Sequence, residues 1–91
     1  MANHADALKR MRQNTKRRMR NRHYRATMRT EIKKVRIAVE SGELETASSN
    51  LNGAVSIIHR LASKGIIHRR NAARRVSRLY KAVNGLKAAQ A

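Results

Sequence analysis

Apolar residues recur every three or four positions from Met28 onward, beginning with Met28, Ile32, Val35 and Val39. This spacing places them on one face of a helix. Gly42 follows where a glycine commonly ends a helix. Proline is absent and strand-like alternation is missing, so the pattern predicts a helix that ends near Gly42.

A second helix is predicted between Glu43 and Gly65. Glu43 and Glu45 suit a helix N-terminus, and Lys64 with Gly65 suits a C-terminus. Its predicted apolar face comprises Leu44, Ala47, Leu51, Val55, Ile58 and Ala62.

A third helical segment follows the apolar pair Ile66 and Ile67. Its predicted apolar face comprises Ala72, Val76, Leu79, Val83 and Leu86. Three helices joined by short glycine-containing turns must pack as an antiparallel bundle. The predicted fold is therefore all-α, with a three-helix antiparallel bundle over residues 24–88 of one domain.

Upstream of Tyr24 the helical pattern continues without an apolar face. Arg and Lys are good helix formers, and Asn3 with Asp6 three residues later can cap a helix start. The first helix is predicted over residues 4–41, with a length of about 55 Å. Residues 1–23 are then an extended basic helical arm that projects beyond the bundle.

The arm is predicted to be unstable on its own. Like charges stand four residues apart, as in Arg12 with Lys16 and Arg18 with Arg22, and each such pair costs about 0.2–0.5 kcal/mol. We expect residues 1–23 to fray in the free protein and to become helical on a polyphosphate.

Composition points to a polyanionic partner. The 91 residues include 22 Lys and Arg against 5 Asp and Glu, a formal net charge of +17 at pH 7. This charge indicates nucleic acid first and an anionic membrane second. Leu, Ile, Val and Phe are scarce enough to be typical of disorder, but of these only Leu8 lies within the first 30 residues. The remainder can therefore form a thin core.

Several functional classes are disfavoured. Without cysteine there is no disulfide scaffold or thiolate metal site. No apolar stretch approaches a membrane span or a signal peptide, so we expect neither secretion nor insertion. The histidines form no ligand set and the glutamates suggest no acid–base pair, so we expect no enzyme activity, metal or cofactor. Tyr24 and Tyr80 are expected in the core, which disfavours base stacking.

A second basic cluster lies at residues 68–78, "HRRNAARRVSR". Arg70, Arg74 and Arg78 are spaced four apart on one predicted face. The residues predicted to face the bundle are Ala72, Ala73 and Val76. Glutamates 40, 43 and 45 gather at the first turn, an acidic end expected to point away from the partner.

Charge around the whole circumference of the arm suits insertion between several phosphate backbones, which favours folded RNA. The predicted RNA-binding residues are Lys9, Arg10, Arg12, Asn14, Lys16, Arg17, Arg18, Arg20, Asn21, Arg22, Arg25, Arg29, Lys33, Lys64, His68, Arg69, Arg70, Asn71, Arg74, Arg75, Ser77 and Arg78. Specificity is expected from RNA shape more than from base edges.

Two other classes compete with this interpretation. A nucleoid-type DNA-binding protein has the same basicity and helicity. A membrane-surface helix needs an apolar face, and residues 9–22 offer only Met11 and Met19. Preference for duplex DNA would favour the first alternative, and liposome leakage the second.

The segments "MANHADALKRMRQN", "MRTEIKKV" and "SKGIIHRRNAARRVSRL" together resemble the bacterial small-subunit ribosomal protein family S-twenty over essentially the whole chain. Arg70 and Asn71 depart from the usual residues of the third segment. The resemblance implies a three-helix bundle with a long first helix. It also implies a structural protein in the cytoplasm, on the ribosome, that binds 16S ribosomal RNA early in subunit assembly and needs few or no protein contacts.

Overall fold

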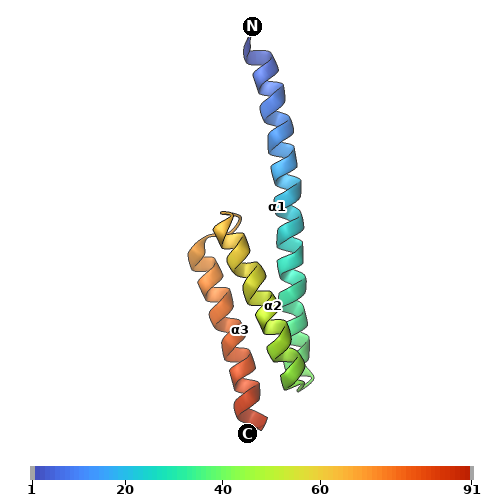
Figure 1. Ribbon diagram of the computed structural model, residues 1–91, viewed down its shortest axis with the longest axis vertical. Helices are drawn as coiled ribbons and strands as arrows, with labels where there is room; N and C mark the ends of the chain where they lie inside the picture. The colour runs from blue at the N-terminus through green and yellow to red at the C-terminus, as the bar shows by residue number, and fades with distance from the viewer. Residues whose placement is uncertain (1, 91) are drawn as a thin grey trace.

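The computed structural model describes residues 2–90, with side chains from residue 4 onward, and these residues form three helices and no strand. They are α1 (Ala2–Glu40), α2 (Leu44–Ser63) and α3 (Arg69–Gln90). Each helix runs antiparallel to the one before it, and the N-terminal half of α1 extends beyond the other two (Figure 1). The molecule measures 70 × 21 × 14 Å. The predicted fold class is confirmed.

Gly42 ends α1 as predicted. It has φ of 74°, a left-handed conformation that glycine adopts without steric cost. Its N–H donates to the Val39 carbonyl at 3.1 Å, and the Glu43 N–H donates to the Ala38 carbonyl at 3.0 Å. These two bonds form a Schellman motif, which satisfies carbonyls at the end of the helix.

Gly65 repeats this arrangement at the end of α2, again with φ of 74°. Its N–H donates to the Ala62 carbonyl at 3.0 Å, and the Ile66 N–H donates to the Leu61 carbonyl at 2.9 Å. The side chains of Ile66 and Leu61 are both buried in the core. The second turn is therefore held by hydrogen bonds and by apolar packing.

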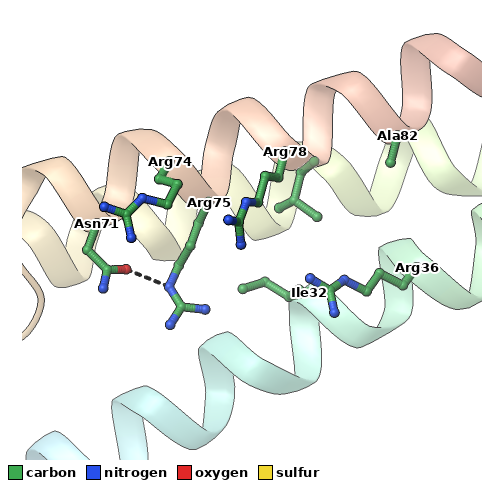
Figure 2. Close-up of a pocket in the computed structure, with 8 residues that line it drawn as sticks. Ile32, Arg36, Asn71, Arg74, Arg75, Arg78 and Ala82 are labelled. Carbon is green, nitrogen blue, oxygen red and sulfur yellow. Dashed lines mark hydrogen bonds between the residues drawn. The ribbon is translucent and has the colours of Figure 1, made fainter.

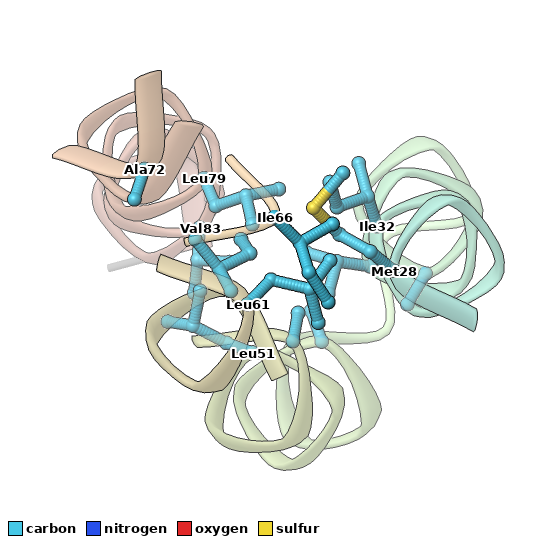
Figure 3. Close-up of a cluster of buried hydrophobic side chains, with 13 residues drawn as sticks. Met28, Ile32, Leu51, Leu61, Ile66, Ala72, Leu79 and Val83 are labelled. Atoms are coloured by element: carbon cyan, nitrogen blue, oxygen red, sulfur yellow. The ribbon is translucent and has the colours of Figure 1, made fainter. Parts of the chain in front are cut away.

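The core runs along the seam where the three helices meet (Figure 3). Its buried members are Met28, Ile32, Val35, Ala38, Ala47, Leu51, Ala54, Ile58, Leu61, Ile66, Ala72, Leu79 and Val83. The sequence pattern missed Ala38, Ala54 and the fully buried Leu61. Because α2 packs against both other helices, it buries a wider face than one row of residues covers.

Two residues expected in the bundle interior are exposed. Tyr80 is 43% exposed, and Ala73 also faces solvent. Each directly follows a buried residue, Leu79 or Ala72, and one helical step of about 100° carries it to the edge of the apolar face. The prediction for Tyr24 fares better, since this ring is half-buried against the core.

The ends of the molecule differ in character (Figure 1). The acidic turn between α1 and α2 lies at the end opposite the arm, near the C-terminal end of α3. There Gln90 Nε2 donates to the Gly42 carbonyl at 2.6 Å. At the other end, α1 already includes Asn3, whose side chain lies outside the described residues, so its predicted capping contact does too. No helix among residues 2–90 is long and apolar enough to cross a membrane.

Candidate nucleic-acid interface

The arm of α1 projects its cations into solvent. Every side chain from residue 4 to residue 20 is exposed, and Tyr24 is the first residue packed against the core. The α1 helix is continuous through this boundary. The arm is helical here, the conformation we expect on RNA, and its fraying in the free protein stays a prediction.

The α2–α3 turn is fastened to α1 where the arm leaves the bundle. Arg25 Nη2 donates to the Ile66 carbonyl at 3.0 Å across 41 residues of sequence. Lys64 Nζ lies 5.3 Å from the centroid of the Tyr24 ring, within the range of a cation–π interaction. Arg25 and Lys64, both predicted to bind RNA, therefore also make contacts that orient the arm.

Local hydrogen bonds organise the start of α3. His68 precedes the helix, and its Nδ1 accepts a hydrogen bond from the Arg70 backbone N–H at 3.1 Å, as a helix cap does. Farther along, Arg75 Nε donates to Asn71 Oδ1 at 2.7 Å. Asn71 thus positions an arginine.

A cleft of about 160 Å³ lies between α1 and α3 (Figure 2). Its floor includes the buried side chains of Ile32 and Leu79. Its other lining residues are Arg36 from α1 and Asn71, Arg74, Arg75, Arg78 and Ala82 from α3. Figure 2 shows the guanidinium groups of Arg36 from α1 and of Arg75 and Arg78 from α3 directed into the space between the helices, with Arg74 lying along α3 near Asn71. Residues far apart in sequence thus form one cationic surface.

The arm and the cleft are joined by shared residues. Asn14, Arg17, Arg18, Asn21, Arg22, Arg25 and Arg29 line one side of α1. Arg25 and Arg29 also line a hollow beside the α2–α3 turn with His68, Asn71 and Arg75. Asn71 and Arg75 in turn line the cleft. We call this continuous surface the basic band, defined by the polar residues lining these three hollows.

Predicted residues outside the basic band are exposed elsewhere on the surface. They are Lys9, Arg10, Arg12, Lys16, Arg20, Lys33, Lys64, Arg69, Arg70 and Ser77. Arg12 and Lys16 lie beside Leu8 and Met11 on another side of the arm. The band also includes Arg36, which the sequence analysis missed. Arg36 follows Arg22 and Arg29 at intervals of seven, a spacing that returns to nearly the same side of a helix.

Acidic side chains do little to neutralise this surface. Among the described residues, the single ion pair joins Lys34 to Glu31 at 3.2 Å, and neither residue lines the band. Those residues also contain no cluster of His, Asp and Glu able to hold a metal ion. Within the band, Asn21 Oδ1 is buried and has no hydrogen-bond partner among residues 2–90. The band is thus a surface of cations without acidic partners and a few amides, suited to binding phosphates and sugars.

The sequence model of the family described as Ribosomal protein S20 matches residues 2–84, which include the arm and the whole band. The chain belongs to the ribosomal protein S20 family. A similar protein from Trichlorobacter lovleyi, named small ribosomal subunit protein bS20, is 52% identical over 94% of this chain and 99% of its own length. The protein of that name from Aquifex aeolicus is 48% identical, over 92% of this chain and 89% of its own.

Membership confirms the resemblance drawn from the sequence segments. The S20 family consists of structural ribosomal proteins of the small subunit and not of enzymes. The same family relationship extends to Geobacter sulfurreducens, whose bS20 protein is 52% identical to this chain over 86 residues. The protein is therefore a component of the small ribosomal subunit.

Proposed function

We propose that the protein binds 16S ribosomal RNA directly and holds separate RNA segments together during assembly of the small ribosomal subunit. As a member of the S20 family it works in the cytoplasm, on the ribosome. The observation that carries the proposal is the continuity of the basic band from the arm into the cleft between α1 and α3.

The geometry supports a model that we call a clip, in which the arm and the exposed face of α3 contact different RNA segments and the bundle holds them at a fixed distance. The arm extends well beyond the bundle, so it reaches RNA at a distance from the face that α3 presents (Figure 1). Arg25 and Lys64 hold the α2–α3 turn against α1 and so fix the angle between these two surfaces. Arginine donors matched to phosphate oxygens position the protein without reading sequence, and the folded RNA supplies specificity through its shape.

Binding to 16S RNA and to duplex DNA of equal length, titrated across salt, tests this function. We expect 16S RNA to be preferred at high salt, and the logarithm of affinity to fall by several units per logarithm of salt. Replacing Arg17, Arg18 and Arg22 by Gln should lower that slope by about two units, at about 0.7–0.9 per lost phosphate contact.

A matched variant controls for the lost charge. Arg60, Lys81 and Lys87 are exposed outside the basic band, and replacing these three by Gln removes the same charge. We expect that variant to keep most of the wild-type slope. Equal loss in both variants, together with equal affinity for DNA and RNA, would indicate a nucleoid-type protein instead. A slope near one for the wild type would also contradict the clip.

A further inference from the structure

Four arginines converge on the cleft between α1 and α3. Arg36 enters from α1, Arg75 and Arg78 enter from α3, and Arg74 of α3 lines the cleft beside Asn71 (Figure 2). Side chains from both helices are required, so the convergence exists only when the bundle is folded. This distinguishes the cleft from the arm, where all the cations belong to one helix.

One member of the cluster is held in place by the protein itself. Arg75 is half-buried, and its Nε donates to Asn71 Oδ1 at 2.7 Å. That bond occupies Nε and leaves the two terminal nitrogens of the guanidinium group as donors. A donor that is already oriented loses less conformational entropy when a ligand arrives.

The lining of the cleft does not neutralise the repulsion among these four arginines. The floor residues Ile32 and Leu79 are only 8% and 4% exposed, and no lining residue is acidic. Like charges gathered beside an apolar floor repel one another, although solvent around the exposed Arg36, Arg74 and Arg78 screens part of that repulsion. An anion that enters the cleft removes this repulsion while accepting hydrogen bonds from both helices.

We propose that this cleft is a site for a single phosphate group, held by Arg36, Arg74 and Arg78 with Arg75 positioned beside them by Asn71. The site rests on the proposed function, which supplies a backbone phosphate of RNA as its occupant, and free inorganic phosphate has the same oxyanion chemistry. A phosphate group is several times larger than a water, and the cleft's 160 Å³ is at least about ten times the roughly 10–15 Å³ that one water needs by the same measure, so the group fits. Phosphate bound here bridges α1 and α3.

Thermal unfolding of the full-length free protein, with inorganic phosphate replacing chloride at constant ionic strength, tests the site. A ligand bound only by the folded state raises its melting temperature. We expect a rise of about 4–8 °C at phosphate concentrations several times the dissociation constant. Well above the dissociation constant the rise should grow only with the logarithm of the phosphate concentration, as expected for one site on the folded state.

Three variants separate the cleft from general positive charge. Arg36→Gln removes one donor, and Ala82→Leu fills the cleft while leaving every charge in place. Both should lose most of the phosphate-induced rise. Arg60→Gln removes an exposed arginine of α2 outside the cleft and should keep it. An equal rise in all three variants, or no rise in the wild type, would overturn the site.

Binding of the same variants to 16S RNA identifies the source of the phosphate. If the RNA backbone fills the cleft, Arg36→Gln should weaken RNA binding by about tenfold or more relative to Arg60→Gln, the loss expected for a charge-assisted contact. Equal RNA affinity of these variants, with the phosphate effect still lost in Arg36→Gln, would overturn the RNA backbone as occupant and leave a site for free phosphate.

The two proposals fail in different ways. If 16S RNA is preferred over DNA but phosphate stabilises the variants equally, the cleft site is wrong and the proposed function stands. If phosphate stabilisation depends on Arg36 but RNA and DNA bind alike, the site stands and the RNA function is wrong.

Discussion

The two halves of α1 share one continuous helix but differ in what surrounds them. From residue 4 to residue 20 every side chain is exposed. Farther along, Met28, Ile32, Val35 and Ala38 are buried in the core. Most helical stability in proteins comes from packing an apolar face. The second half has that support, whereas the first half has only its intrinsic propensity, opposed by like charges four residues apart.

This contrast shows how one helix serves two tasks. The packed half, together with α2 and α3, is an anchor whose shape is set before any partner binds. The exposed half carries donors in every direction, and its charge is neutralised only by a partner that surrounds it. The packed half is therefore stabilised by the protein itself, and we expect the exposed half to be stabilised by its partner.

The largest expected difference is in amide hydrogen exchange of the free protein. Amides of residues 4–20 should exchange nearly as fast as in an unfolded chain, while those around Val35 and Ile58 should require global unfolding. A small core supplies about 3–5 kcal/mol, so the protection should differ by about a hundredfold to a thousandfold or more. Equal protection in both halves would show that the arm is as stable as the packed half of α1.

Circular dichroism provides the complementary measurement on the bound protein. Helix content should rise when 16S RNA is added, because the arm folds on binding. The three-residue variant of Arg60, Lys81 and Lys87 should show the same gain. Unchanged helicity would mean that the arm is already helical before it binds.

A second comparison uses leucines from the two halves of the molecule. Leu61→Ala removes a fully buried side chain from the core and should lower the free energy of unfolding by about 2–5 kcal/mol. Leu8→Ala changes a side chain that is 44% exposed on the arm and should alter it by less than about 0.5 kcal/mol. Urea unfolding measures both, and a cost at Leu8 similar to that at Leu61 would show that the arm packs against the bundle.

The smallest expected effects concern two glycines, with opposite signs. Gly65→Ala should destabilise the bundle by about 1–2 kcal/mol, because an alanine in the left-handed conformation is strained. Gly85 lies within α3 with open space around the position of an added Cβ. Gly85→Ala should therefore stabilise the protein by about 0.5–1 kcal/mol. Thermal melts check both, and neither change should affect exchange in the arm.

Most of the fold was predictable because helix signals are local. The apolar spacing identified three helices, and Gly42 and Gly65 marked two of their ends. The detailed face of α2 was less predictable, as Leu61 shows. A residue beside a predicted apolar row is buried or exposed according to where the other helices lie, and spacing along one helix does not give that position.

The residues of the candidate site likewise fall into those that the sequence predicts and those that only the fold brings together. The cations of the arm and of residues 68–78 are evident from composition. The participation of Arg36 is not, because it depends on α3 lying beside it across the cleft. Likewise, nothing local indicates that Arg25 donates to the Ile66 carbonyl, 41 residues away.

The sequence by itself determined that the chain is helical, where α1 and α2 end, which half of α1 lacks a core and which charge is expected of its partner. These properties depend on residue types and on spacing within one helix. Only the tertiary structure decided which side of each helix faces its neighbours, that Tyr80 is exposed, and that arginines of α1 and α3 meet in one cleft. Such contacts depend on the rotation and separation of packed helices, which are set by how their side chains interlock.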